Sequence, residues 1–428
     1  MATLRDSFRG NIRSFGMVIA LVALIVFFQW RTGGNVLTPS NAMNIIINNS
    51  HVLIMTMGML MVIVIGHIDL SVGSVAATVG IVVALVIQNW HWNWILAVLL
   101  GLAVGFAVGS WQGFWLAKVG IPGFITTLAG MMFFRGLNQY IGHSKTIPVP
   151  EGIQQMGSGY LPEWGPNTGM NNSTLLLGII AIVAIVFLEF RKRARLARIH
   201  ADVPPMYVSI SKLVLFGVVI GYLVHLFGTG RPGTSFPIPG VILVVLALIY
   251  SFVTSRTTIG RHVYAVGGNR AAAALSGVNT KGTYFFVMLN MSVLAALAGI
   301  LFIGRMRASG PADGLNWELD VIAAVFIGGA AVSGGVGTVM GSIIGGLVMA
   351  VLNNGLQLMG TGAASQQMIK GLVLLAAVAF DVYNKTQGKP SITGWLTRKK
   401  GSAGSQDAEG GSVAEAGPVN PAEPTATA

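Results

Sequence analysis

The chain contains no cysteine and few charged residues. Of its 428 residues 9% are charged, whereas soluble domains carry about 25% charged residues. The absence of cysteine excludes disulfides, thiolate chemistry and cysteine-ligated metal sites. What the sequence has instead is 53% hydrophobic residues, 57 glycines and a mean hydropathy of +0.71. This composition predicts an all-α polytopic membrane protein whose helices approach one another closely at small residues.

The sequence also lacks the motifs of common enzyme classes. It has no Gly-x-x-x-x-Gly-Lys-Ser/Thr phosphate loop, no His-Glu-x-x-His, no nucleophile elbow and no spaced acid pair for glycoside chemistry. The net charge of +12 lies in short runs beside apolar segments, which fits membrane topology and argues against nucleic-acid binding. We therefore expect a non-catalytic protein that binds no cofactor of its own and has the lipid bilayer as its environment.

Twelve apolar runs are candidates for membrane spans. They cover residues 15–30, 45–66, 70–89, 94–117, 121–142, 174–190, 210–228, 238–255, 284–304, 319–333, 336–352 and 366–384. Several are shorter than the roughly 20 residues that a helix needs to cross a bilayer. We expect about 10–12 transmembrane helices, some of them tilted, re-entrant or merged.

The basic residues predict the orientation, because Lys and Arg gather on the cytoplasmic side. With a cytoplasmic N-terminus at residues 1–14, alternating spans place the basic loops 191–209 and 256–283 and the tail 386–428 in the cytoplasm. The polar loop 143–173 is then external, and both termini are cytoplasmic. The transmembrane domain covers residues 15–385, and from about residue 401 the composition is that of a disordered segment. Arg305 and Arg307 fall outside and do not fit the pattern, so the spans after them are the least certain.

Asp69 is the acid that stands out, since burying a charge at membrane depth is costly. It lies in Gly66-His67-Ile68-Asp69-Leu70-Ser71, where two apolar runs are separated by only a few residues. We expect Asp69 to cap the following helix, with Ser71 and Ser74 in its first turn. One interpretation is a broken or re-entrant helix that faces a polar pathway, as in transporters. The other is an ordinary interfacial turn with an N-cap.

Amide side chains embedded in apolar sequence are further candidates for a pathway. They are Asn48, Asn49, Asn353, Asn354 and Gln357. Amides can join helices by hydrogen bonds, or they can line a route for a neutral, polyhydroxylated solute. Arg135 is more simply interpreted as a residue at a helix end that snorkels or pairs than as a ligand.

A short helix with both ends specified is predicted in the basic loop 256–283. Asn269 is a good N-cap, Arg270 to Ser276 contains strong helix formers, and Gly277 stands where a left-handed C-terminal stop belongs. A helix of this length is not stable alone and needs a surface to pack on, either the membrane domain or a partner. Its candidate docking residues are Gly268, Asn269, Arg270, Ala272, Ala273, Leu275 and Gly277.

Five separated motifs resemble the permease subunits of bacterial sugar ABC importers. They are Gly66-His67-Ile68-Asp69-Leu70-Ser71-Val72-Gly73-Ser74, Val266-Gly267-Gly268-Asn269-Arg270 with Leu275-Ser276-Gly277-Val278, Glu318-Leu319-Asp320-Val321-Ile322-Ala323-Ala324, Ile327-Gly328-Gly329, and Leu352-Asn353-Asn354-Gly355-Leu356. The resemblance covers residues 40–384 and is to the ribose, galactose and xylose group. The long segment 143–255 is similar to the xylose or multiple-sugar type.

The resemblance implies the partners and the role of the short helix. It implies a permease that works as a homodimer or pair in the bacterial inner membrane, with a cytoplasmic ATPase that uses ATP and an extracytoplasmic sugar-binding protein. The helix at Asn269–Gly277 would then be the coupling helix that the ATPase holds. The expected cargo is a monosaccharide, xylose or a related sugar. The alternative is an ion-gradient-driven transporter of a small neutral solute, which the scarcity of acids within the spans disfavours.

Overall fold

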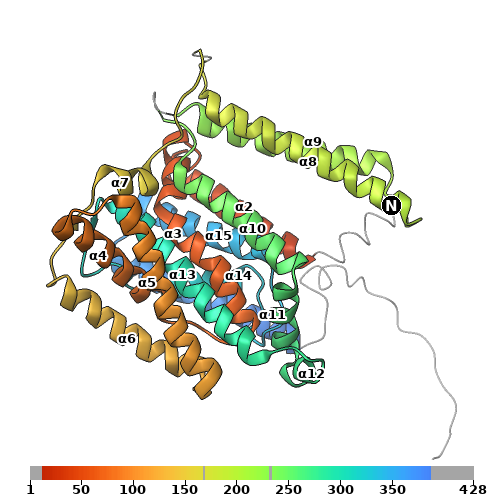
Figure 1. Cartoon of the computed structure of the whole chain (residues 1–428). Helices are drawn as coiled ribbons and strands as arrows, with labels where there is room; N and C mark the ends of the chain where they lie inside the picture. Colours follow the sequence, from red (N-terminus) through yellow and green to blue (C-terminus); the bar gives the residue numbers. More distant parts are fainter. Residues whose placement is uncertain (1–11, 167–168, 231–233, 387–428) are drawn as a thin grey trace, which may run out of the picture. The chain divides into compact units, whose positions relative to one another are not determined.

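The computed structural model describes residues 12–166, 169–230 and 234–386, which are almost entirely helical (Figure 1). The predicted all-α class is confirmed, since the only strands in this described part are β1 and β2, with two residues each. They pair antiparallel, with Ile147 opposite Ser309. In chain order the elements are α2 (Ile12–Arg31), α3 (Pro39–Val64), α4 (Val72–Trp90), α5 (Trp94–Phe114), the π-helix η1 (Trp115–Val119), α6 (Gly123–Ile141), β1 (Ile147–Pro148), α7 (Glu151–Ser158), α8 (Asn172–Arg198), α9 (Met206–Gly228), α10 (Ile238–Arg256), α11 (Thr258–Gly268), α12 (Arg270–Leu275), α13 (Thr280–Met306), β2 (Ala308–Ser309), α14 (Trp317–Ile327), α15 (Val339–Leu358) and α16 (Ala363–Thr386).

Eight helical stretches within the described ranges are long and apolar enough to cross a membrane. They are α3, α4, α5 with η1, α8, α9, α10, α13 and α15, and α2 adds a shorter apolar helix. Each predicted run corresponds to a helix. The run 319–333 was wrong at its end, because α14 stops at Ile327. Gly329, Gly334 and Gly335 adopt positive φ angles of 82°, 78° and 72°, a conformation that ends a helix.

Some predicted loops contain regular structure. The segment 143–173 holds β1 and α7, and the segment 191–209 is helical up to Arg198 and again from Met206. Several helices begin at a side-chain cap, in which a side-chain oxygen accepts a hydrogen bond from a free backbone N–H of the first turn. These caps are Asn93 of α5, Asn171 of α8, Thr257 of α11, Asn269 of α12, Asn279 of α13 and Thr338 of α15.

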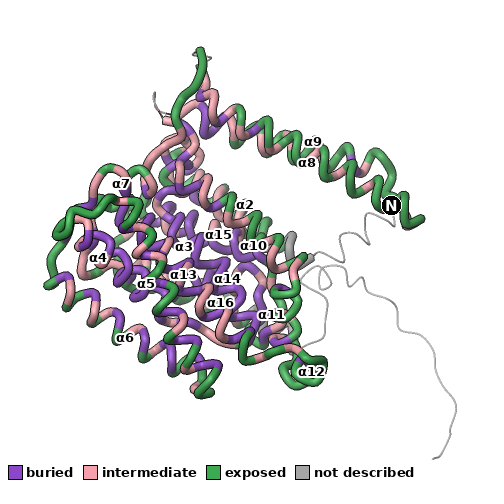
Figure 2. The backbone as a smooth tube through the Cα atoms, in the orientation of Figure 1, coloured by how far each residue is buried: buried purple, intermediate pink, exposed green. Residues whose placement is uncertain are grey.

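The core gathers around α13, which packs against α3, α4, α5 and α7. Figure 2 shows buried residues along α3, α13, α14 and α15, and exposed ones along α8 and α9. Packing divides the chain into Met1–Tyr383 and Asn384–Ala428. The predicted N-terminal segment up to residue 11 and the tail from residue 387 lie outside the described residues.

Candidate functional site

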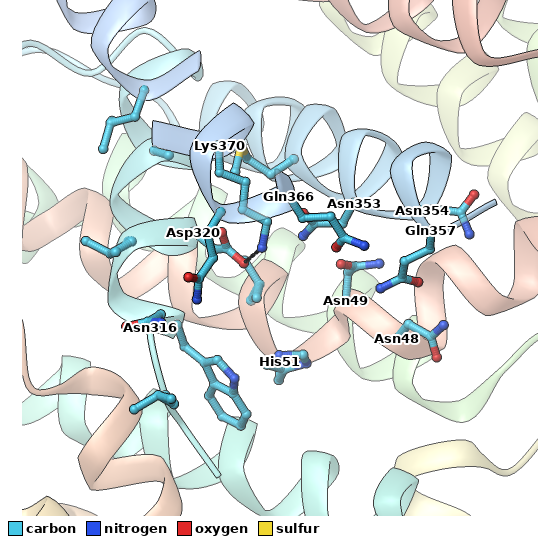
Figure 3. Close-up of a pocket in the computed structure, with 18 of the residues that line it drawn as sticks. Asn48, Asn49, His51, Asn316, Asp320, Asn353, Asn354, Gln357, Gln366 and Lys370 are labelled. Atoms are coloured by element: carbon cyan, nitrogen blue, oxygen red, sulfur yellow. Dashed lines mark hydrogen bonds and ion pairs between the residues drawn. The ribbon is translucent and has the colours of Figure 1, made fainter. Parts of the chain in front are cut away.

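A cavity of about 590 Å³ lies between α3, α13, α14, α15 and α16. Seven amide side chains from α3, α15 and α16 line it: Asn48, Asn49, Asn353, Asn354, Gln357, Gln366 and Gln367 (Figure 3). The first five are predicted pathway residues, and folding brings them together although α3 and α15 are distant in the chain. A small polar solute could find both donors and acceptors on this lining.

Asn353 and Asn49 point into the same space from α15 and α3 (Figure 3). The Nδ2 of Asn49 donates to the carbonyl of Ile45 at 2.8 Å, on its own helix. The Oδ1 of Asn353 is buried and accepts no hydrogen bond from any residue that the structure describes. Because a buried carbonyl without a partner is costly, the Asn353 side chain is suited to accept from a solute hydroxyl.

Asn354 makes a different contact from its neighbour. Its Nδ2 donates to Oδ1 of Asn41 at 2.8 Å, and Nδ2 of Asn41 donates back to its Oδ1 at 2.8 Å. Both residues are buried, so this reciprocal pair joins α3 to α15. The helix-joining interpretation of the embedded amides therefore describes the Asn354 side chain, while its place in the pathway stays a prediction.

Three aromatic rings from three helices meet at one wall of the cavity. The ring centroid of His51 on α3 lies 4.4 Å from that of Trp317 on α14 and 5.1 Å from that of Phe302 on α13. The Trp317 and Phe302 centroids are 4.4 Å apart. Tilted and edge-on contacts of this kind fix the orientation of the rings. The Trp317 ring thus adds an apolar, flat surface beside the amides.

Charged groups also reach the cavity. Lys370 Nζ on α16 lies 2.9 Å from Asp320 Oδ2 on α14 (Figure 3). Arg305 lines the same cavity from α13, and its guanidinium carbon lies 5.9 Å from the Phe302 ring centroid. The cavity is therefore lined by charged side chains as well as by neutral amides, and an ion pair links α14 to α16.

Asp69, Ser71 and Ser74 lie apart from this cavity. Asp69 is buried in the break between α3 and α4, and its Oδ1 accepts from the backbone N–H of Ser71 at 2.8 Å and from the Ser71 hydroxyl at 2.6 Å. Ser71, not Asp69, occupies the N-cap position of α4, so the predicted cap was wrong by two residues. Gln112 Nε2 of α5 donates to Ser71 Oγ at 2.7 Å, and the Ser74 hydroxyl donates to the Ser71 carbonyl at 2.8 Å. These bonds fix the break, and a pathway role for the three residues stays a prediction.

Arg135 forms an ion pair between α6 and α14. Its Nη2 lies 3.8 Å from Oε1 of the buried Glu318 at the start of α14. The sequence predicts Arg135 at a helix end, but it lies within α6. The pair gives a structural reason for its charge and connects α6 to the helix that carries Trp317 and Asp320.

The short helix α12 has the predicted ends. Asn269 Oδ1 accepts from the backbone N–H of Ala272 at 3.0 Å, and Gly277 has a φ of 84°. The N–H of Val278 donates to the Ala273 carbonyl and the N–H of Gly277 to the Ala274 carbonyl, each at 3.0 Å. These two bonds complete a Schellman motif, which satisfies carbonyls at the helix end.

The side chains of α12 divide into an inner and an outer set. Ala273 is 5% exposed and belongs to the core of this chain, whereas Leu275 is 90% exposed. Ala272 and Gly277 are also exposed. Since Ala273 faces inward, its predicted contact with a partner is corrected to a contact within this chain, and the outer residues are those that a partner could reach.

Close backbone contacts tie this segment to the break between α3 and α4. A Cβ on Gly267 would lie 1.8 Å from the Val64 carbonyl oxygen, whereas Gly268 has open space. The hydroxyl of Tyr264 donates to the Gly337 carbonyl at 2.8 Å, and burial raises the pKa of Tyr264, which keeps the proton on this donor. Gly267 and Tyr264 therefore hold the α11–α12 segment against the transmembrane helices of the same chain.

Two aromatic side chains and an arginine also connect α12 to this break. The guanidinium carbon of Arg270 lies 5.2 Å from the Tyr284 ring centroid. That ring lies edge-on to His67, with 5.1 Å between centroids. Arg270, Tyr284 and His67 thus link α12 to the break that contains Asp69.

The family model described as "Branched-chain amino acid transport system / permease component" matches residues 41–378. The chain belongs to this family of ABC transporter permeases. The permease is 34% identical over 376 residues to the xylose transport system permease protein XylH of Haemophilus influenzae, which covers 88% of this chain and 97% of the relative. It is also 32% identical over 370 residues to the ribose import permease protein RbsC of Escherichia coli, covering 86% and 93%. No solved structure matches it.

Family membership establishes a multi-pass inner-membrane permease component, which is non-catalytic. Sequence reasoning missed several cavity residues of this permease: His51, Trp317, Gln366 and the Asp320–Lys370 pair. One signal was available, because Lys370 is the only charged residue in the first 15 residues of the apolar run 366–384. A charge in such a run predicts a buried partner, but nothing local to the run points to Asp320.

Proposed function

We propose that this permease imports a pentose, xylose or a related sugar, as the membrane subunit of an ATP-driven importer. The observation that supports this most is the cavity lined by eight amides, Asn316 included, and the Trp317 ring, in a chain whose relatives are named for xylose and ribose. A pentose has several hydroxyls that donate and accept at once, and amides match both. Its ring also carries apolar C–H faces, which suit an aromatic wall.

The same proposal assigns the partners. The ATPase binds ATP and docks on α12, with Gly268, Asn269, Arg270, Ala272, Leu275 and Gly277 around the contact. A sugar-binding protein delivers the sugar from outside, and a second permease copy completes the membrane unit. Loops 191–209 and 256–283 and both termini then face the cytoplasm, in agreement with the excess of Lys and Arg there.

A reconstituted system tests this function. The permease is incorporated in proteoliposomes with its ATPase, the binding protein is added outside, and uptake of labelled xylose, ribose, galactose and arabinose is followed. We expect uptake of xylose or ribose that requires ATP inside and the binding protein outside. Uptake that persists without ATP and follows an imposed proton or sodium gradient would contradict the proposal and restore the gradient-driven alternative.

A further inference from the structure

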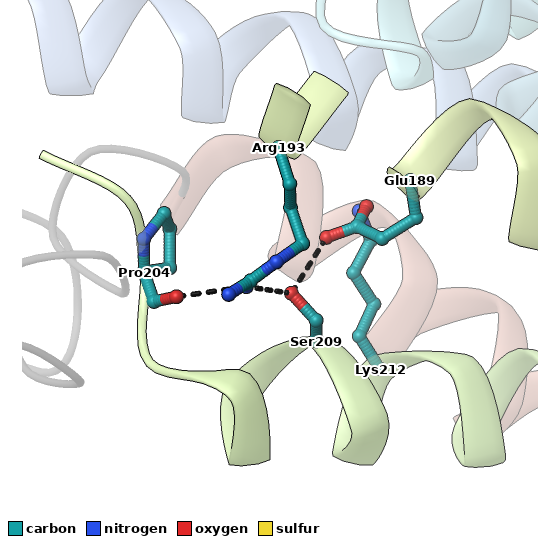
Figure 4. A network of polar contacts seen from close by, with 5 residues as sticks. All are labelled: Glu189, Arg193, Pro204, Ser209 and Lys212. Atoms are coloured by element: carbon teal, nitrogen blue, oxygen red, sulfur yellow. Dashed lines mark hydrogen bonds and ion pairs between the residues drawn. The ribbon is translucent and has the colours of Figure 1, made fainter. Parts of the chain in front are cut away.

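The hairpin of α8 and α9 is fixed at one end by a polar network (Figure 4). Lys212 Nζ lies 2.7 Å from Glu189 Oε2, and the Ser209 hydroxyl donates to Glu189 Oε1 at 3.0 Å. Arg193 Nη1 donates to the Pro204 carbonyl and to Ser209 Oγ, each at 2.8 Å. The carboxylate of Glu189 is therefore already paired within the hairpin.

The opposite face of α8 carries a continuous stripe of exposed residues. A helix turns about 100° per residue, so Glu189 and Arg193 share the face of Gly178, whose Cα packs against Val224 of α9. Ile180, Phe187, Arg191, Arg195 and Arg198 lie on the other side, and all five are exposed. We call these five residues the α8 stripe. It is apolar up to Phe187 and basic from Arg191 onward.

The stripe lies where the helix leaves the hydrocarbon core. The 27 residues of α8 make a helix about 40 Å long, against about 30 Å of hydrocarbon, so its last turns reach the headgroups. Between residues 189 and 212 the chain has six Lys and Arg residues (191, 192, 193, 195, 198 and 212) against two acids (189 and 202). None of the three stripe arginines forms an ion pair with any residue in the described ranges.

We propose that the α8 stripe binds an anionic phospholipid, with the acyl chains along Ile180 and Phe187 and the headgroup phosphate on Arg191, Arg195 and Arg198. Charge and apolar surface adjoin on one helix face, so one lipid covers both, whereas a partner in the aqueous phase would cover only the charges. Arg is suited to phosphate because its planar fork makes two parallel hydrogen bonds. This site is independent of the sugar cavity.

Native mass spectrometry of the detergent-purified full chain tests the site. It is titrated with dioleoyl phosphatidylglycerol and with dioleoyl phosphatidylcholine, which share acyl chains and differ in headgroup charge. We expect the wild type to retain phosphatidylglycerol at a lipid concentration at least tenfold lower. Each arginine removed should weaken retention roughly fivefold, so a triple variant with Arg191→Gln, Arg195→Gln and Arg198→Gln should lose the preference.

Two further variants distinguish a specific lipid site on α8 from a general attraction of anionic lipid to the positively charged protein. A triple Arg→Lys variant at the same positions should keep the preference for phosphatidylglycerol but retain it more weakly than the wild type, because Lys lacks the planar fork. Arg256→Gln with Arg261→Gln and Lys281→Gln removes equal charge elsewhere and should keep the wild-type preference. Equal retention of both lipids by the wild type, or equal losses in the stripe and control variants, would overturn the proposal. So would a stripe variant that keeps its lipid preference but no longer co-purifies with the ATPase, since the surface would then belong to a protein partner.

Discussion

Asn353 and Asn354 are neighbours on α15 but make different contacts, so a shift of one position along the helix changes the role of an amide. Consecutive residues on a helix point about 100° apart. Both amides line the cavity, but Asn354 is bonded to Asn41 across the α3–α15 contact, whereas Oδ1 of Asn353 has no partner among the described residues. The sequence shows both amides in an apolar run. It cannot distinguish their roles, because the partner of Asn354 lies 313 residues away in the chain.

Alanine substitutions should separate these roles. Asn353→Ala should lower ATP-driven sugar uptake roughly three- to tenfold, the effect of losing about one hydrogen bond, with little change in thermal stability. Asn354→Ala should instead lower stability by about 1 kcal/mol, because it leaves Oδ1 of Asn41 without its donor in the core, while Nδ2 of Asn41 keeps its bond to the Val36 carbonyl. The measurements are uptake in proteoliposomes and thermal unfolding in detergent.

The double variant Asn41→Ala with Asn354→Ala is the control for the pair. It should cost less stability than the sum of the two single changes, because no amide is left without its partner. If Asn353→Ala destabilised the protein as much as Asn354→Ala while uptake per folded protein stayed normal, the assignment of Asn353 to the sugar would be wrong.

At the scale of an element, α12 shows which features a sequence can specify. Its N-cap and C-terminal glycine act on backbone groups within a few residues, so Asn269 and Gly277 predicted both ends correctly. Which alanine faces inward depends on how the helix lies against α11 and α13, and this is tertiary information. Ala273 was for this reason misassigned to a partner.

A substitution on the exposed side of α12 should impair ATPase binding, whereas one on its buried side should lower the stability of the permease. Leu275→Glu places a charge on a side chain that is 90% exposed, so the permease should fold normally while co-purification of the ATPase and coupled uptake are lost. Ala273→Trp should destabilise the permease itself by about 1–3 kcal/mol, the usual cost of overpacking. Thermal unfolding and ATPase pull-down, measured together, distinguish the two.

An exposed position away from α12 provides the matched control. Leu315→Glu also replaces an exposed leucine, at 50%, and lies in the loop between β2 and α14, beyond the far end of α13, so it should leave ATPase pull-down unchanged. Normal ATPase binding by the Leu275 variant would show that docking takes place elsewhere.

At the scale of the molecule, the sequence located the membrane runs because hydrophobicity is a local property. It could not show that residues 310–316 pass close to the start of α4. A Cβ on Gly73 would lie 2.1 Å from the Gly314 carbonyl oxygen, and one on Gly314, whose φ is 74°, would lie 2.0 Å from the Gly73 oxygen. Two backbone segments that are distant in the sequence thus come into contact at glycines, and the sequence around either glycine does not indicate which residue it contacts. The contact matters because α14, which follows this loop, brings Trp317 and Asp320 to the cavity.

Gly73→Ala should therefore disturb both stability and transport. The added methyl cannot be accommodated by a side-chain movement, since it meets backbone, and we expect a loss of about 1–3 kcal/mol in thermal unfolding. Sugar uptake should fall further than the folded fraction does, because displacement of the 310–316 loop moves Trp317 and Asp320.

Gly136→Ala is the matched control: it lies within α6 with no atom within 4 Å of an added Cβ. It should be neutral or stabilise by about 0.5–1 kcal/mol, as alanine is the better helix former. Equal unfolding temperatures for the two variants would mean that α4 and the loop do not touch, and that another contact positions α14.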